Sequence, residues 1–252
     1  MEDKNPIQVA DRLFQLIETL AADGPAGLIE LSKKLNLNKS TVHRLLNSLI
    51  FMGYVRQDSD TLKYGLTFKI WEIANQSLSK IDIVNIARPH LKKLVEETGE
   101  TVHLVARDGV NAIYLDKVES YTNSVRLVSK VGQSIPLYCS GVGKAILAEM
   151  KDEDIRTVWE TSPIKQLTEH TIVSFDEFMK KIERVREVGY ALDDEENELG
   201  VRCIAVCLKD YRGKARYALS ISAPVTRMSD ERLTVLADFC LKCKEEINRE
   251  LR

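Results

Sequence analysis

The stretch LIELSKKLNLNKSTVHRLLNSLIFMGYV, residues 28–55, decides the fold of the N-terminal part of the chain. Leu31 and Leu35 lie one helical turn apart, and a turn is expected at residues 36–38. The helix that follows has an apolar stripe formed by Val42, Leu45, Leu46 and Leu49. Its opposite face carries Ser40, Thr41, Arg44, Asn47 and Ser48. Two helices joined by a tight turn predict a helix-turn-helix, whose second helix enters the DNA major groove.

The flanking residues complete a winged module. An earlier helix is predicted from the helical spacing of Val9, Leu13, Leu16, Ile17 and Leu20. It ends at the breaker sequence DGPAG, residues 23–27. Strand-like residues 54–56 and 62–64 flank a DSDT turn, which predicts a two-stranded wing. We therefore expect a winged helix-turn-helix domain over residues 1–66.

The distribution of charge points to DNA although the net charge of −2 does not. Residues 31–57 contain basic side chains and no acidic one. Asp58 and Asp60 at the wing tip would be repelled by phosphates, so only the flanks of the wing are expected to contact the DNA backbone. The predicted DNA contacts are Lys39, Ser40, Thr41, His43, Arg44, Asn47, Arg56 and Lys63. The alternative is a small helical packing domain with a solvated polar face.

Residues 67–81 read as a linker helix. Ile70, Ala74 and Leu78 form one stripe with Trp71 beside it, which is too apolar for a helix that stands alone in water. We expect this helix to join two domains and to pack on a partner subunit. Two-fold symmetric operators require two DNA-binding domains, which also favours a homodimer or a dimer of dimers.

Residues 82–252 alternate helix and strand signals and predict an α+β domain with an antiparallel sheet flanked by helices. The helices are expected at 83–98, where Pro89 either kinks the helix or opens a new first turn, after a capping box of Ser174 and Glu177, and from Ser229 onward. The strands are expected at 101–107, 111–118, 124–131, 200–208 and 216–224.

The stretch PLYCSGVGKAIL, residues 136–147, resembles part of a phosphate-binding loop. It fails as a P-loop because Tyr138 stands where the leading glycine belongs and Ala145 stands where the magnesium-binding hydroxyl belongs. A helix that starts near Ser140 still presents unpaired N–H groups at its positive dipole end. This arrangement suits a small anion.

The order of the motifs resembles the IclR family of bacterial transcriptional regulators. The resemblance is carried by KSTVHRLLNSL with GYV, PLYCSGVGKAILA, GYALDDEENELGVRCIAV and ALSISAP, and it covers essentially the whole chain. It implies a GAF-like C-terminal domain that binds a small organic acid, and a dimer or dimer of dimers on operator DNA. Cys207 departs from the family, many members of which carry proline there.

The resemblance also implies that the effector pocket is lined by Ser140, Gly141, Val142, Asp193, Cys203, Ser220 and Ser222. Alternation along the strands puts Ser220 with Ser222, and Val201 with Cys203, on common faces. Ionised Asp193 accepts hydrogen bonds only, which favours a hydroxylated acid such as a sugar acid or keto acid. Alternatively, the glycines only allow close packing and the serines bond locally.

A second class of function is a small-acid enzyme that uses Cys203 as nucleophile with a histidine base. No short motif places any of the four histidines beside that cysteine, so we expect no enzyme activity. Cys203 with Cys207 and Cys240 with Cys243 could each be half a metal site, but neither pair has partner cysteines with histidines nearby, so buried small hydrophobic residues are expected. The acidic run 193–198 lacks calcium-loop spacing and is expected to be a solvated loop. No cofactor and no metal are expected.

The composition is that of an ordinary globular protein, with 44% hydrophobic and 29% charged residues. No stretch approaches the roughly 20 apolar residues of a membrane helix. The N-terminal sequence lacks the pattern of a secretory signal, and the odd, sparse cysteines fit a reducing cytoplasm.

Overall fold

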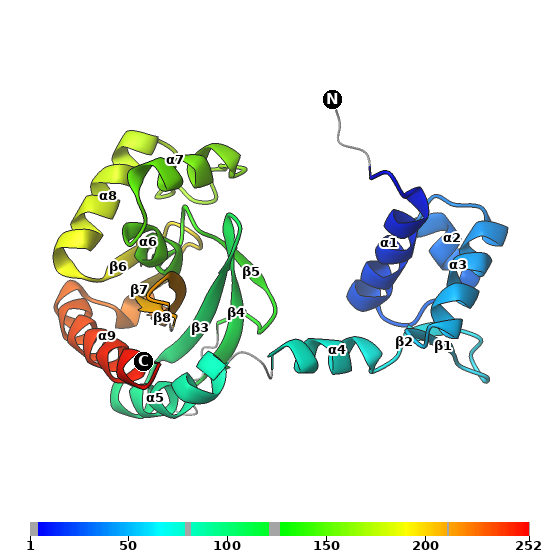
Figure 1. The fold of residues 1–252 in the computed structure, drawn as a ribbon, viewed down its shortest axis with the longest axis horizontal. Helices are drawn as coiled ribbons and strands as arrows, with labels where there is room; N and C mark the ends of the chain where they lie inside the picture. Colours follow the sequence, from blue (N-terminus) through cyan, green and yellow to red (C-terminus); the bar gives the residue numbers. More distant parts are fainter. Residues whose placement is uncertain (1–4, 79–81, 121–126, 211, 252) are drawn as a thin grey trace. The chain divides into compact units, whose positions relative to one another are not determined.

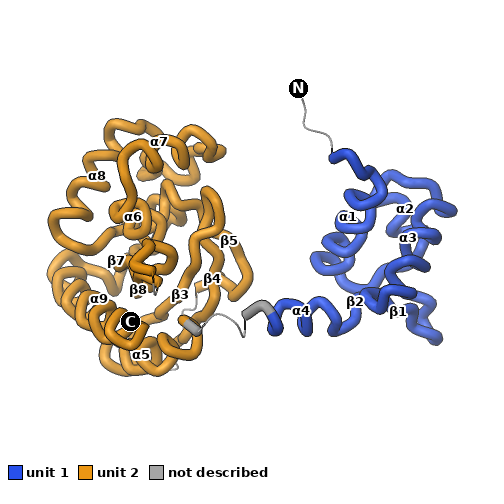
Figure 2. The backbone as a smooth tube through the Cα atoms, in the orientation of Figure 1, with its two compact units in different colours: residues 1–81 blue, residues 82–252 orange. Residues whose placement is uncertain are grey.

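The computed structural model describes residues 5–78, 82–120, 127–210 and 212–251. The chain divides into two compact units, residues 1–81 and residues 82–252, which are described separately (Figure 2). In the described part of the chain, no helix is long and apolar enough to cross a membrane.

Unit 1 is a winged helix-turn-helix (Figure 1). Its elements are α1 (Gln8–Asp23), α2 (Leu28–Lys34), α3 (Lys39–Phe51), β1 (Val55–Gln57), β2 (Tyr64–Leu66) and α4 (Lys69–Leu78). The predicted stripes form its core, with Leu16, Leu20, Leu31, Val42, Leu45, Leu46 and Leu49 buried. Val9 is the exception, because 56% of it is exposed at the start of α1.

The turn between α2 and α3 is held by local contacts. Asn36 adopts a positive φ of 50°, which asparagine tolerates better than most residues. The Ser32 hydroxyl donates to the Leu37 carbonyl at 2.6 Å, and the Leu37 amide donates to the Ser32 carbonyl at 3.1 Å. These bonds fix the direction in which α3 leaves the turn.

The wing is a short antiparallel hairpin in which Arg56 pairs with Gly65. Asp58 organises its tip by accepting hydrogen bonds from the Thr61 amide and hydroxyl, both at 2.8 Å. These bonds lower the pKa of Asp58. Lys63 lies just before β2 rather than inside a strand.

Unit 2 is an α+β domain built on one antiparallel sheet with the order β5-β4-β3-β8-β7-β6. The strands are β3 (Thr101–Asp108), β4 (Asn111–Val118), β5 (Ser134–Pro136), β6 (Ala191–Asp194), β7 (Val201–Lys209) and β8 (Ala215–Pro224). The helices are α5 (Asp82–Thr98), α6 (Gly141–Ala148), α7 (Asp152–Thr161), α8 (Phe175–Val188) and α9 (Asp230–Glu250). The prediction of an antiparallel sheet flanked by helices is confirmed.

The helices cover both faces of the sheet (Figure 1). The helices α5 and α9 lie against one face. The helix α6 lies on the other face, and residues of α7 and α8 pack with it in one apolar cluster. Pro89 lies inside α5, so the helix continues through it.

Two local predictions in unit 2 are wrong. No strand forms over residues 127–131, and the rest of the predicted strand 124–131 lies outside the described residues. Instead, the Lys117 ammonium donates to the carbonyls of Leu127 and Ser129, both at 2.8 Å, so a side chain satisfies these groups in place of a neighbouring strand. The second error concerns Ser174, which precedes α8 but makes no capping hydrogen bond with its side chain.

Candidate functional site

The recognition helix α3 presents an exposed polar face. The predicted contacts Lys39, Ser40, His43, Arg44 and Asn47 are exposed on it, and Thr41 is half-buried. The His43 ring and the Asn47 amide, one turn apart, lie 3.4 Å from each other. The first turn of α3 holds no acidic side chain, so its positive dipole end is uncompensated.

The surrounding cations differ in whether they already interact with other groups of the unit. Lys34, although it lies in the acid-free stretch, forms ion pairs with Asp23 at 3.0 Å and Glu30 at 3.1 Å. Lys69 donates to the Met52 carbonyl and lies over the Tyr54 ring at 4.9 Å from its centroid. The wing cation Arg56 is exposed on β1, as is Lys63 before β2. The cations on α3 and on the wing are exposed and form no ion pair among the described residues, which is also true of Lys33 on α2.

A row of polar side chains crosses the sheet of unit 2. The register pairs Asp193 of β6 with Cys203 of β7, and Cys203 with Ser222 of β8. In the next row, Ser220 of β8 pairs with His103 of β3. Asp193 is only 4% exposed, and both serines are buried too. Residues from distant segments thus meet on the sheet face that α6 covers.

The start of α6 is capped by its own serine. The Ser140 hydroxyl accepts from the Gly143 amide at 3.2 Å and donates to the Pro136 carbonyl at 2.6 Å. The amides of Gly141 and Val142 have no hydrogen-bond partner among the described residues. These two donors, and not the Ser140 hydroxyl, remain open at the positive end of the helix.

The two glycines of α6 allow close packing, Gly143 against the backbone of Leu137 just after β5 and Gly141 against the sheet. A Cβ atom on Gly143 would lie 2.1 Å from the Leu137 carbonyl oxygen, a distance that no side chain tolerates. A Cβ atom on Gly141 would lie 3.4 Å from both the Ala205 Cβ and the Asp193 amide nitrogen. The missing side chain of Gly141 therefore faces β6 and β7, which supports a packing role for this glycine alongside its free amide.

The carboxyl group of Asp193 is held inside the domain. Its Oδ1 accepts hydrogen bonds from the amides of Glu196 at 2.9 Å and Asn197 at 3.3 Å. Burial raises the pKa of Asp193 to about 7, although the nearby Lys144 ammonium opposes the shift. Near neutral pH, Asp193 therefore exists in both protonation states, and its protonated form can donate a hydrogen bond.

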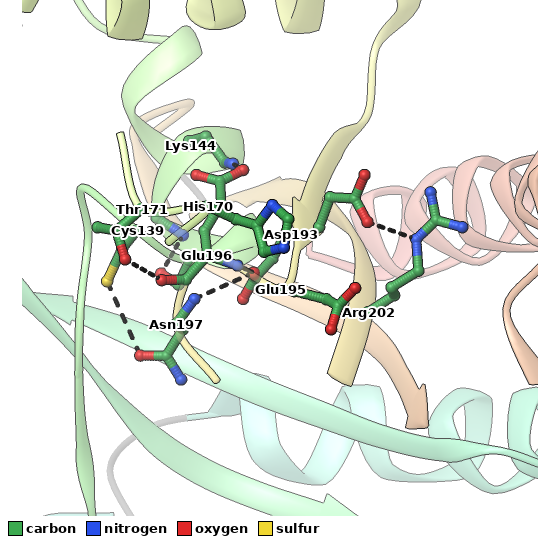
Figure 3. Close-up of polar contacts among 12 residues, drawn as sticks. Cys139, Lys144, His170, Thr171, Asp193, Glu195, Glu196, Asn197 and Arg202 are labelled. Carbon is green, nitrogen blue, oxygen red and sulfur yellow. Dashed lines mark hydrogen bonds and ion pairs between the residues drawn. The ribbon is translucent and has the colours of Figure 1, made fainter. Parts of the chain in front are cut away.

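A buried ion pair lies beside Asp193 (Figure 3). Lys144 of α6 is 1% exposed and pairs with Glu196, whose Oε2 has no hydrogen-bond partner among the described residues. The Glu196 carbonyl accepts from the Thr171 hydroxyl at 2.6 Å. The expectation of a solvated acidic loop at 193–198 is therefore wrong for Asp193 and Glu196, which are buried.

Sequence reasoning missed the contribution of β3 and β4 to this site. His103 of β3 lies in hydrogen-bond range of Ser129 at 2.8 Å and of Ser222 at 3.4 Å. Its ring lies 4.9 Å from that of Tyr114. Burial lowers the pKa of His103 to about 3, so the ring is neutral. Alternation along β3 could have placed it on the site face, but nothing in the sequence gives the pairing with β8.

The chemistry around Cys203 does not suit catalysis. Burial raises the pKa of the Cys203 thiol, with the Asp193 charge adding to the effect, so the thiolate is not formed near neutral pH. His103, the buried histidine of the adjoining row, has a lowered pKa and already bonds Ser129 and Ser222. A weak base and an un-ionised thiol make a poor nucleophilic pair.

An exposed recognition helix in one unit and a buried polar row in the other are features of two-domain transcriptional regulators. Comparison with known families defines the class further. The profile described as the IclR helix-turn-helix domain matches residues 9–59. The profile described as the bacterial transcriptional regulator IclR C-terminal matches residues 75–249. The chain belongs to the IclR family.

Individual relatives are similar to this protein over nearly the whole chain. The HTH-type transcriptional regulator KdgR of Escherichia coli (strain K12) is 36% identical over 233 residues, covering 92% of this chain and 88% of KdgR. The acetate operon repressor of Salmonella typhimurium is 32% identical over 244 residues, covering 96% and 89% of the two chains. The crystal structure of Thermotoga maritima IclR is similar with a TM-score of 0.83 at 30% identity, over 96% of this chain and 98% of that one.

The protein is therefore a DNA-binding transcriptional regulator with an effector-binding C-terminal domain. The relatives are regulators, and the enzyme alternative has no support.

Proposed function

We propose that a small hydroxylated organic acid binds in unit 2, between the start of α6 and the row Asp193–Cys203–Ser222, and changes the affinity of unit 1 for operator DNA. The observation that carries the proposal is the meeting of two unpaired amides, at Gly141 and Val142, with buried hydroxyl and carboxyl groups on the facing sheet.

The two ends of the site suit the two ends of such an acid. The free amides and the helix dipole favour a carboxylate by a few tenths to about 2 kcal/mol. Ser220 and Ser222, whose hydroxyl oxygens lie 3.4 Å apart, can donate to and accept from ligand hydroxyls. Asp193 with its raised pKa can do both as well. Val201 and Cys203 are half-buried on β7 and would line the apolar side.

Calorimetric titration of the full chain tests this site. The probes are D-gluconate, pyruvate and benzoate, which represent hydroxylated, keto and aromatic acids. We expect gluconate to bind best, and Ser222→Ala to weaken it by about 1 kcal/mol or more through a lost hydrogen bond. The exposed Ser174→Ala, which loses no side-chain cap bond, is the matched control. Equal affinity of Ser222→Ala and Ser174→Ala for gluconate would contradict the assignment of the acid to this site.

We propose that unit 1 binds operator DNA in the cytoplasm through α3 and the wing. Arg44 and Thr41 would contact base edges, with Ser40, His43 and Asn47 beside them. Lys39, Arg56 and Lys63 would contact phosphates. The exposure of these cations on one helix and one hairpin supports the assignment.

We propose a division of the chain into residues 1–66 for DNA binding, 67–81 as a linker helix and 82–252 for the effector. The linker helix α4 would also join subunits in a homodimer or a dimer of dimers. Phe68 is 83% exposed and Trp71 is 64% exposed, which is unusual for side chains of this size. Sedimentation of the full chain tests the proposal, since a monomer of 28.6 kDa at micromolar concentration would contradict it.

A further inference from the structure

A cavity of unit 2 lies away from the effector row. Its volume is about 460 Å³, and it is lined by Arg107, Gly109, Asp210, Arg212, Lys214, Ala215 and Arg216. These residues belong to the β3–β4 turn, the β7–β8 turn and the adjoining ends of β3 and β8. The effector row lies toward the opposite ends of those strands, at His103 and Ser222. The two sites therefore share strands but no lining residue.

The lining is strongly basic, with four cationic side chains and a single carboxylate. That carboxylate, Asp210, is already engaged in shaping the turn, because its Oδ1 accepts from the amides of Arg212 and Lys214, both at 2.9 Å. An excess of positive charge inside a concave surface concentrates the electric field and attracts anions.

Two of the arginines face each other across the sheet. The β3–β8 ladder extends as far as the pair Ala106 and Tyr217, and the next residues along the two strands are Arg107 and Arg216. Like charges on neighbouring strands repel. Neither arginine forms an ion pair with a carboxylate in the described ranges of the chain. A bound anion would relieve this repulsion.

The arginines are also partly preorganised. Arg107 donates to the Gly109 carbonyl at 3.1 Å and to the Met150 sulfur at 3.2 Å, so its side chain is fixed at the wall of the cavity. The Arg216 guanidinium lies over the Tyr217 ring, 5.8 Å from its centroid. The remaining guanidinium N–H groups can hold the oxygens of a phosphate in a two-pronged arrangement.

We propose that this cavity binds a phosphorylated small molecule, with the phosphate held by Arg107 and Arg216 and with Lys214 at the rim. The volume lies within the range of about 300–1,000 Å³ that is typical of small-ligand sites. A concave site of this size suits a compact anion better than the extended backbone of a nucleic acid. The regulator would thus have a second ligand, of a different chemical class from the proposed organic acid.

Calorimetric titration of the full chain with inorganic pyrophosphate tests the proposal. We expect one pyrophosphate per chain, and Arg216→Gln and Arg107→Gln should each weaken binding about tenfold or more. Arg184→Gln, at an exposed arginine of α8, is the matched control and should bind as the unsubstituted chain does. Because Arg107 contacts Met150, the thermal unfolding of each variant is measured first. If Arg107→Gln is unstable, the result for Arg216→Gln decides the outcome.

Three results would overturn the proposal. The first is the absence of saturable pyrophosphate binding. The second is loss of binding in Arg44→Gln but not in Arg216→Gln, which would place the ion on the recognition helix. The third is displacement of pyrophosphate by double-stranded DNA of unrelated sequence together with weaker DNA binding by Arg216→Gln, which would make the surface a DNA contact. Ser222→Ala should leave pyrophosphate binding unchanged, so this test is independent of the effector proposal.

Discussion

The DNA-binding surface and the effector site are built in opposite ways. The residues of the first lie within a short stretch of sequence on one helix and one hairpin, and all of them except half-buried Thr41 are exposed. Those of the second come from α6, β6, β7, β8 and β3, and most are buried. A surface site is tolerant of substitution because its side chains contact little else. A buried site makes each polar group depend on its neighbours, so the same kind of change costs more there.

The largest effect is expected from Lys144→Met. It removes one partner of the buried pair and leaves the Glu196 carboxylate without compensation, which should destabilise unit 2 by about 3–5 kcal/mol. Urea unfolding, followed by Trp159 fluorescence in a Trp71→Phe background, reports on this unit alone. Adding Glu196→Gln should restore much of the loss. If Lys144→Met and the exposed control Arg184→Met lowered the free energy of unfolding by the same small amount, the contrast between buried and exposed sites would be contradicted.

The next effect concerns the two glycines of α6. Gly143→Ala places a Cβ against the Leu137 backbone and should cost about 3 kcal/mol or more, since backbone atoms must move. Gly141→Ala meets its neighbours at 3.4 Å, an ordinary contact, and should cost less than about 1 kcal/mol. The same unfolding experiment measures both. Equal costs would show that the start of α6 does not pack against the Leu137 backbone as described.

A pH-dependent effect is expected from Asp193→Asn. The pKa of Asp193 is about 7 in the folded protein against 3.8 ordinarily, so ionising it costs free energy in the folded state only. The cost is absent below pH 3.8, grows as the pH rises to about 7 and is constant above that. Relative to Asp193→Asn, the unsubstituted chain should therefore lose about 2–3 kcal/mol of stability between pH 5 and pH 8.

The opposite titration of His103 does not obscure this result. Its pKa is lowered from 6.5 to about 3, so its contribution is present above pH 6.5 and is lost as the pH falls toward 3. Both chains carry His103, and the difference between their stability curves isolates Asp193. Parallel curves from pH 5 to pH 8 would show that Asp193 titrates as an ordinary exposed carboxyl group.

The smallest effect on folding, and a clear one on DNA, is expected from Arg44→Ala. The side chain is exposed, so unit 1 should keep its stability, while preference for the operator over unrelated DNA should fall by about 1–3 kcal/mol if Arg44 pairs with a guanine. Lys39→Ala should weaken both DNAs alike. Fluorescence anisotropy at fixed salt compares them, and unchanged discrimination in Arg44→Ala would reassign the recognition face.

The sequence predicted the local features of both regions. Helical spacing placed Val42 and Leu49 in the core of unit 1, and alternation put Ser220 and Ser222 on one face of a strand. It could not give the register that sets Asp193 beside Cys203, because strand pairing depends on contacts between distant segments. The burial of Lys144 was also missed. Lysine is almost never fully buried unless it is paired, and the sequence does not show that Glu196, 52 residues away, is the partner.

The central claim is that an acid bound in unit 2 alters DNA binding by unit 1. Operator affinity, measured by anisotropy during a titration with D-gluconate, tests it most directly in the unsubstituted chain and in Ser222→Ala. The account predicts that the acid changes operator affinity about 5–150-fold in the unsubstituted chain. Ser222→Ala should bind the operator equally well without acid and need about tenfold more acid for the same change. An identical acid dependence in both chains would contradict the account.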